Sequence, residues 1–201
     1  MLDPVGSTSW HHRHHAYFRQ LNEILSREGP AEPVVLIVGP GAVTRMAAPF
    51  LNDAAVPQRS RLRELIGDAA RYADQVLRRI PGVPLRSLEP VELEQVLTCR
   101  HRLVVVDRSR RVLAAVARDL AAAEGHCVDI TREPLPTQAD VVVAFNVICR
   151  LDDPAAGMRH IAEAVRPGGW LLIDDRSADV YLCGRTDFAV VAPKIRHRKA
   201  L

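Results

Sequence analysis

A chain of 201 residues, of which 48% are hydrophobic, can form one α/β domain with a sizeable core. Aromatic residues make up only 4%, so aliphatic side chains must fill it, and a net charge of +3 argues against nucleic acid as the main partner. No apolar run is long enough to cross a membrane, and residues 1–9 lack a secretory pattern. The four cysteines are too far apart for a zinc motif or a disulfide framework, so we expect free thiols and a cytoplasmic protein.

The chain begins with a predicted N-terminal helical segment, residues 1–33. Apolar residues recur on one face between positions 10 and 27, and Gly29-Pro30 ends the helix. Four histidines lie between His11 and His15 at its start, but no acidic or cysteine ligand accompanies them, so we expect no metal site. His15 is kept as a candidate catalytic base.

The next segment joins a strand to a glycine turn. Five apolar residues from Val34 to Val38 run into Gly39-Pro40-Gly41, which predicts a buried parallel strand, a tight turn and a helix over residues 44–56. Glycines without a Cβ let the backbone approach a ligand, and the free amides of a helix start suit a polar or anionic group. The alternative is a glycine turn that serves only strand-to-helix packing.

Residues 57–99 are too long for an ordinary connection between two strands. We interpret them as an inserted helical pair, which forms a lid over the site, an extra packing layer or the surface of a homodimer. Arginines over 59–86 would suit an anionic substrate, although a solvated helix face explains them as well. The second helix of the pair spans 90–99. The first spans 60–80, and the predicted inward face of this first helix comprises Leu62, Leu65, Ile66, Ala69, Ala73, Val76, Leu77 and Ile80.

Buried strands and helices then alternate. This pattern predicts an α/β fold for residues 34–201: a doubly wound, mostly parallel seven-stranded sheet in three α/β/α layers. Ser109 and Asp153 are expected to begin helices, and residues 194–199 to form a solvated tail. The further predicted strands are 103–106, 126–130, 141–148, 170–173, 180–184 and 188–193.

Several predicted strands end at glycine or at a polar residue. Gly39, Asp107, Asp129 and Asn146 each follow a buried strand directly. Because the carboxyl ends of parallel strands meet at one edge of a sheet, and ligands bind at that edge, we expect these residues to line a ligand site.

Five segments, taken in order, resemble a class I S-adenosylmethionine-dependent methyltransferase of the Rossmann-like superfamily. They are VLIVGPGAV, LVVVDRS, HCVDITREPLP, ADVVVAFNVI and AVRPGGWLLIDD, and the likeness covers residues 34–56 and 101–195. Nicotinamide binding fits less well, because its ribose-binding acid should lie about 20 residues after the glycine turn. The chain departs from the family pattern at Ile37, where an acid is usual, and at Val43, where a third glycine is common.

The resemblance implies S-adenosyl-L-methionine as the cofactor and assigns its binding residues. Carboxylates would accept hydrogen bonds from the ribose hydroxyls and from the adenine amine. The implied set is Gly39, Pro40 and Gly41 at the methionine part, Asp107 and Arg108 at the ribose, Asp129 and Ile130 at the adenine, and Phe145 and Asn146 beside the amine and the methyl group.

The implied activity is methyl transfer to a small-molecule acceptor by in-line displacement. Two alternatives remain: a catalytically inactive member of the fold that acts as a binding or regulatory protein, and a nucleic-acid methyltransferase. A base is needed only if the acceptor arrives protonated, and Asp152 and Asp153 join His15 as candidates for it. Either aspartate could instead cap the helix that begins at Pro154.

Overall fold

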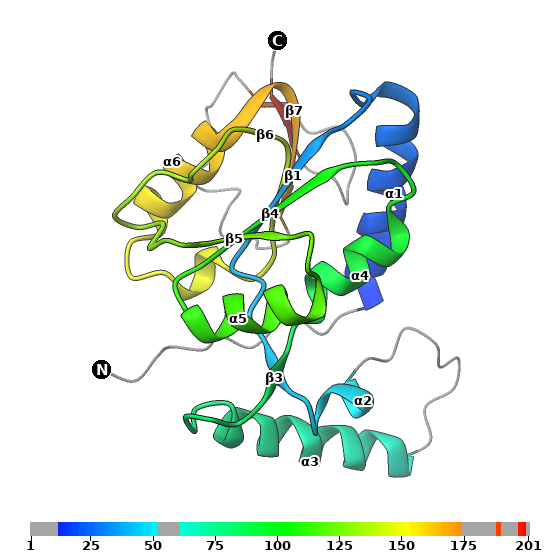
Figure 1. The fold of residues 1–201 in the computed structure, drawn as a ribbon, viewed down its shortest axis with the longest axis vertical. Helices are drawn as coiled ribbons and strands as arrows, with labels where there is room; N and C mark the ends of the chain where they lie inside the picture. The colour runs from blue at the N-terminus through cyan, green and yellow to red at the C-terminus, as the bar shows by residue number, and fades with distance from the viewer. Residues whose placement is uncertain (1–11, 52–60, 174–187, 190–196, 200–201) are drawn as a thin grey trace.

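The computed structural model describes residues 12–51, 61–173, 188–189 and 197–199. At its centre lies a sheet of seven strands (Figure 1). In spatial order they are β5 (Glu124–Cys127), β4 (Arg102–Asp107), β1 (Val34–Val38), β6 (Ala139–Ala144), β7 (Val165–Ile173), β9 (His197–Lys199) and β8 (Phe188–Ala189). The first five strands run parallel, and β9 and β8 continue the sheet in antiparallel pairs. The predicted fold class is confirmed.

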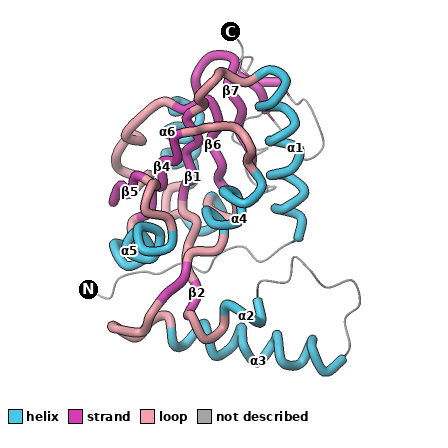
Figure 2. The backbone as a smooth tube through the Cα atoms, turned by 45° about the vertical axis from the view of Figure 1, so that its right-hand side comes forward, coloured by secondary structure: helices cyan, strands magenta, loops and turns pink. Residues whose placement is uncertain are grey.

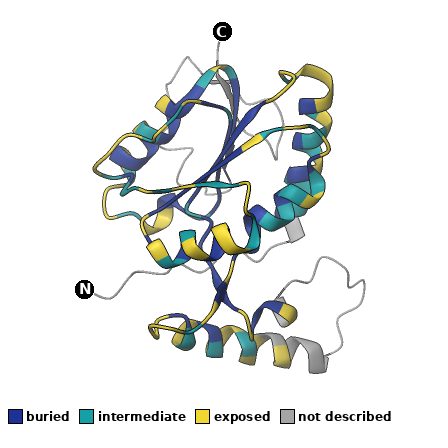
Figure 3. Ribbon diagram, in the orientation of Figure 1, coloured by how far each residue is buried: buried dark blue, intermediate teal, exposed yellow. Residues whose placement is uncertain are grey.

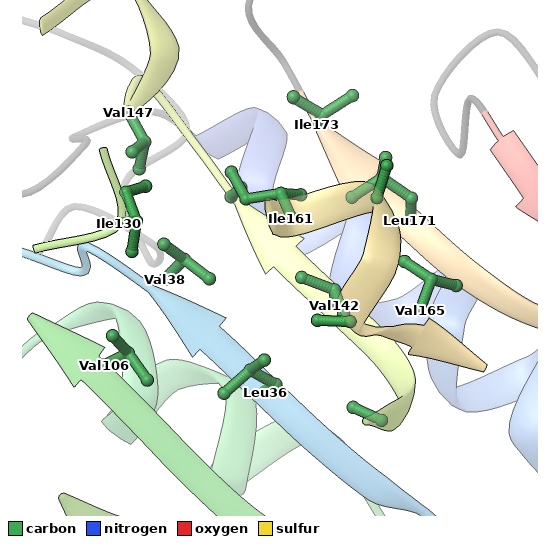
Figure 4. Close-up of a cluster of buried hydrophobic side chains, with 14 of the residues drawn as sticks. Leu36, Val38, Val106, Ile130, Val142, Val147, Ile161, Val165, Leu171 and Ile173 are labelled. Carbon is green, nitrogen blue, oxygen red and sulfur yellow. The ribbon is translucent and has the colours of Figure 1, made fainter. Parts of the chain in front are cut away.

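Helices cover both faces of the sheet. On one face lie α1 (His12–Glu28), α4 (Glu89–Val96) and α5 (Arg110–Asp119), and on the other lies α6 (Pro154–Ala164) (Figures 1 and 2). Side chains of a strand alternate between faces, so β1 supplies both cores. Leu36 and Val38 pack toward α6 with Ile161 (Figure 4), whereas Val35 and Ile37 belong to the cluster under α1 and α4.

The N-terminal helix shares the core of the sheet. Phe18 and Leu21 of α1 are fully buried, and they lie in one cluster with Ile37 and with Leu93 of α4. Ile37 therefore fills an apolar position under these helices, where the acid usual in related sequences would have to be buried.

After the glycine turn the chain leaves the sheet. The predicted helix over 44–56 is wrong in its first part, because Val43–Thr44 form a strand, β2, that pairs antiparallel with β3 (Leu85–Arg86). Between these two strands lie α2 (Ala48–Leu51) and α3 (Arg61–Leu77). We call the described residues 43–51 and 61–86 the arm; it projects beyond the edge of the sheet at which β1 ends (Figures 1 and 2).

Helix α3 exposes the face that its sequence predicts to be buried. Residues of that predicted face are largely accessible to solvent: Leu65 is 67% exposed, Ile66 41% and Val76 51%, so the predicted inward face is wrong for the described residues (Figure 3). The helix packs on α2 and β2, and its buried positions include Asp74. The sheet is already covered by α4 and α5 and offers α3 no apolar face.

The C-terminal prediction is corrected in one respect. Residues 197–199, expected in a solvated tail, form β9, which pairs with both β7 and β8 and so lies inside the sheet. Residues 188–189 form a strand as predicted, and the predicted strand 180–184 lies outside the described residues. No helix in the described ranges is long and apolar enough to span a membrane.

Two other boundaries also move. The strand predicted over 126–130 is β5, Glu124–Cys127, which begins two residues earlier and ends three residues earlier than predicted. Strand β6 ends at Ala144, and the predicted end of that strand is instead a short 3₁₀ helix, η1 (Ile148–Arg150). Both changes leave more loop at the carboxyl edge of the sheet than the sequence predicts.

Candidate functional site

A pocket lies where β1, β4, β5 and β6 end. It encloses about 650 Å³, counting the space at its open mouth. Seven of the nine predicted cofactor-binding residues line it, all except Pro40 and Phe145. The lining residues are Val38, Gly39, Gly41, Val106, Asp107, Arg108, Val128, Asp129, Ile130, Asn146, Val147, Arg150 and Leu151.

The glycine turn forms one wall. Gly39 and Gly41 have φ angles of 61° and 63°, a region that residues with a side chain seldom adopt. The Gly39 amide donates to the carbonyl of Val106 at 2.7 Å, which holds the turn against β4. A Cβ on Gly39 would lie 3.0 Å from Cγ2 of Val147, across the pocket wall. The turn therefore needs glycine for both conformation and space.

Asp107 ends β4 and is 8% exposed. Its Oδ1 accepts a hydrogen bond from the Ser109 amide at 2.7 Å, which fixes the carboxylate at the start of α5. Ser109 in turn caps α5, since its Oγ accepts from the Val112 amide at 3.3 Å, as its sequence position predicts. The strand end and the helix start thus orient the acid together.

Asp129 lies in the turn after β5. Its Oδ1 accepts from the Thr131 amide at 3.1 Å and from the Thr131 hydroxyl at 2.7 Å. The hydroxyl bond is the main reason that the pKa of Asp129 lies below its usual value; burial opposes it, and the amide bond, Arg132 and Arg108 add to it. His160 of α6 donates from Nδ1 to the Ile130 carbonyl at 2.8 Å. Thr131 therefore favours the ionised carboxylate of Asp129, and Thr131 and His160 together hold the turn in place.

Asn146 and Phe145 follow β6 and take opposite roles. Asn146 lines the pocket with a φ of 51°, a left-handed conformation that asparagine tolerates better than most residues. Phe145 is 2% exposed and stacks on His14 of α1, with ring centroids 4.1 Å apart. Phe145 thus joins the core under α1 and is not among the described lining residues.

The three candidate bases lie outside the described lining of the pocket. Asp153 caps α6, with its Oδ1 accepting from the Ala156 amide at 2.9 Å. Asp152 is exposed, and His15 is a half-buried residue of α1 whose Nδ1 is buried without a hydrogen-bond partner. The structure gives none of them a direct contact with the pocket.

Sequence reasoning missed Arg150 and Leu151, which line the pocket from the end of η1. Their only sequence signal is that they follow Asn146 closely. A predicted strand running to residue 148 would have placed Arg150 at a different point on the edge. The short 3₁₀ helix turns both side chains to the site.

Comparison with known proteins agrees with this geometry. Residues 9–199 match the model of a family described as "methyltransferase domain". No curated protein matches the chain.

Solved structures share the fold at low sequence identity. The N-methyltransferase NodS from Bradyrhizobium japonicum is 14% identical, with a TM-score of 0.50 over 93% of this chain and 94% of that one. NodS with bound S-adenosylhomocysteine gives 0.48 at 14% identity over 89% and 71%. CalS10, an amino pentose methyltransferase from Micromonospora echinaspora with bound S-adenosylmethionine, gives 0.43 at 16% identity over 83% and 50%.

The family match spans nearly the whole chain. The fold agrees with it, because the carboxyl edge of the doubly wound sheet holds the glycine turn, Asp107 and Asp129. The chain belongs to the methyltransferase domain family, as a class I S-adenosylmethionine-dependent methyltransferase.

Proposed function

We propose that the chain methylates a small-molecule acceptor by in-line displacement, with S-adenosylmethionine bound in the pocket described above. The observation that carries the proposal is the meeting of the glycine turn, Asp107 and Asp129 in one pocket.

The residues present fit the cofactor. Gly39 leaves room where a Cβ would press on Val147. Asp107 and Asp129 offer carboxylate oxygens at the ends of neighbouring strands, and such oxygens accept hydrogen bonds from hydroxyl and amine groups. Ile130 and Leu151 supply the apolar surface that a purine ring requires. When bound, the cofactor supplies a methyl group on a sulfonium cation.

The protein's own contribution is positioning. An in-line displacement at a sulfonium methyl needs the two reactants aligned and water excluded. Asp107 and Asp129 are fixed by Ser109 and Thr131, and Asn146 is fixed at the end of β6 by its backbone conformation. We assign no base, because Asp153 serves α6 and neither Asp152 nor His15 lines the pocket.

Calorimetric titration with S-adenosylhomocysteine tests the cofactor assignment. We expect the wild-type protein to bind and Asp107→Ala to bind about tenfold or more weakly, because hydrogen bonds to a charged group contribute roughly 1.5–3 kcal/mol. Asp68→Ala is the control, since Asp68 is an exposed residue of the arm that pairs with Arg71. Equal affinity in the Asp107 variant, or no binding by the wild type, would overturn the assignment.

The acceptor class needs a second measurement. We expect formation of S-adenosylhomocysteine with members of a small-molecule panel and none with RNA or DNA. Methylation of nucleic acid that weakens steeply with added salt would favour the alternative acceptor class.

A further inference from the structure

Asn146 lies between two residues that enter opposite cores of the protein. Phe145 belongs to the cluster under α1 and α4, whereas Val147 belongs to the cluster under α6. In an extended strand, residues two positions apart point to the same face of the sheet. The chain must therefore turn at Asn146, and among the described residues this is the only non-glycine with a positive φ, 51°. The turn leaves Asn146 at the wall of the cofactor pocket.

The left-handed conformation of Asn146 is strained, so it persists only where the neighbouring residues hold it. On one side, Val147 packs so close to the glycine turn that a Cβ on Gly39 would lie 3.0 Å from Cγ2 of Val147. On the other side, the side chain of Phe145 is 2% exposed. The conformation of Asn146 therefore depends on the contacts that fix the ring of Phe145.

Three rings on one face of α1 enclose the ring of Phe145. They belong to His14, Tyr17 and Phe18, whose spacing of three and four residues places them on one side of the helix. Their centroids lie 4.1, 5.4 and 5.9 Å from the centroid of Phe145. Tyr17 and Phe18 meet that ring at angles of 40° and 37°. His14 is inclined by only 14° and is 1% exposed, so it covers one flat side of Phe145.

We propose that His14 is a positioning residue for the cofactor: its stack on Phe145 holds Asn146 in the conformation that lines the pocket. The proposal rests on the proposed function for its ligand, S-adenosylmethionine, and is independent of the acceptor. Helix α1 supplies none of the described lining residues, yet it then sets the affinity for the cofactor through the end of β6. Because coupling between two sites is reciprocal, a bound cofactor must in turn tighten the docking of α1.

Calorimetric titration of folded variants with S-adenosylhomocysteine tests this role. We expect His14→Ala to bind about threefold to tenfold more weakly than the wild type, which is the range that one aromatic pair contributes. His14→Phe keeps a flat ring against Phe145, so it should bind within about twofold of the wild type. Unchanged affinity in His14→Ala, or a full loss in His14→Phe as well, would overturn the proposal.

Leu25→Ala is the matched control for a merely structural effect. Leu25 is a buried residue of the same helix and the same core cluster, and it has no place among the rings around Phe145. Its replacement should lower the melting temperature at least as much as His14→Ala does, but leave the affinity for S-adenosylhomocysteine unchanged. An equal loss of affinity in Leu25→Ala would show that His14 only stabilises the packing of α1, which contradicts a positioning role.

A double-mutant cycle with Asn146→Gly tests the route through Asn146. Glycine has no side chain to position and adopts a positive φ without strain, so the stack has nothing left to hold. In the Asn146→Gly background, His14→Ala should therefore weaken binding by less than about twofold. The same loss in both backgrounds would show that His14 acts on the pocket by another path.

Hydrogen exchange of the wild-type protein gives a test that needs no variant to fold. Saturation with S-adenosylhomocysteine should slow amide exchange in α1, residues 12–28, more than in α3, which packs on α2 and β2. Unchanged exchange in α1 overturns its coupling to the pocket while the proposed function stands. A wild-type protein that binds no S-adenosylhomocysteine overturns the proposed function and the role of His14 together.

Discussion

Two glycines of this chain both have a positive φ angle but lie in different surroundings. Gly39 has a φ of 61° and Gly82 a φ of 83°, but a Cβ would press on Val147 only at Gly39 and would meet nothing within 4 Å at Gly82. We expect each alanine variant to lose about 1–2 kcal/mol of folding stability through backbone strain. Only Gly39→Ala should also weaken binding of S-adenosylhomocysteine, because Val147 lines the pocket. Equal binding by both variants in calorimetry would contradict this role of Gly39.

Glu92 of α4 gives the protein a predictable pH response. Burial raises the pKa of Glu92 above its ordinary value of 4.5, so the folded state favours the protonated form. The contribution of protonated Glu92 to folding stability is complete below pH 4.5, and it is lost as the pH rises through the raised pKa. Glu92→Gln should therefore be more stable than the wild type at neutral pH, with the difference vanishing toward pH 4.5. Melting temperatures of both proteins between pH 4.5 and neutral pH test this expectation, and a difference that does not change with pH would contradict it.

At the level of single residues, the sequence predicts acids better than arginines. Asp107 and Asp129 each follow a buried strand, and that position alone brings them to the edge of the sheet. Arg150 has no such marker, because it reaches the pocket through the short helix η1, where the sequence predicts the end of a strand. Phe145 was predicted at the cofactor, but the alternation of side chains after β6 turns it toward His14.

Among the elements, α3 and α4 make a matched comparison. Leu65 of α3 is 67% exposed, whereas Leu93 of α4 is fully buried under α1. We expect Leu65→Ala to change the unfolding free energy by less than about 0.5 kcal/mol and Leu93→Ala to cost about 2–5 kcal/mol. Denaturant titration measures both.

The homodimer proposed from residues 57–99 stays a prediction, and the same variant tests it. If two copies pair through the exposed face of α3, Leu65→Ala should destabilise the protein in a concentration-dependent manner and shift its sedimentation toward a monomer. A sedimentation pattern of the wild type that does not vary with concentration would argue against the dimer.

The arm also shows why sequence patterns failed locally. Amphipathicity predicts that α3 has an apolar side, but it does not say whether a partner surface is available. Strand β2 has two residues, and its partner β3 lies about forty residues away, so no local pattern reveals the pair. Once β2 forms, the helix expected directly after the glycine turn cannot begin there.

For the molecule as a whole, the alternation of buried strands and helices was sufficient to predict the layers. Strands β1, β4 and β6 are apolar on both sides, which only a doubly covered parallel sheet explains. The position of β9 between β7 and β8 was not predictable, because His197–Lys199 carries no apolar signal.

This architecture predicts an uneven stability. Amides of β1 should exchange with solvent only on global unfolding, since the strand is buried and paired on both sides. Amides of α3 should exchange faster, through local opening, because half of the helix faces solvent. Hydrogen-exchange mass spectrometry of the peptides covering 34–38 and 61–77 measures this, and equally slow exchange in both would contradict it.

The strand pair β2 and β3 at the base of the arm, which we call the stalk, has a consequence for how this enzyme can be altered. Val43 and Arg86 are direct partners in β2 and β3, so the chain departs and returns at neighbouring points. Ala42 and Leu85 pack together with Val112 and Ala115 of α5, which roots both ends of the stalk in the domain. The segment beyond it is therefore a detachable module: a short hairpin turn could replace it without changing the register of any strand in the main sheet. A variant with that turn should keep the pocket at the carboxyl edge of the sheet, since none of the described lining residues lies between positions 43 and 86.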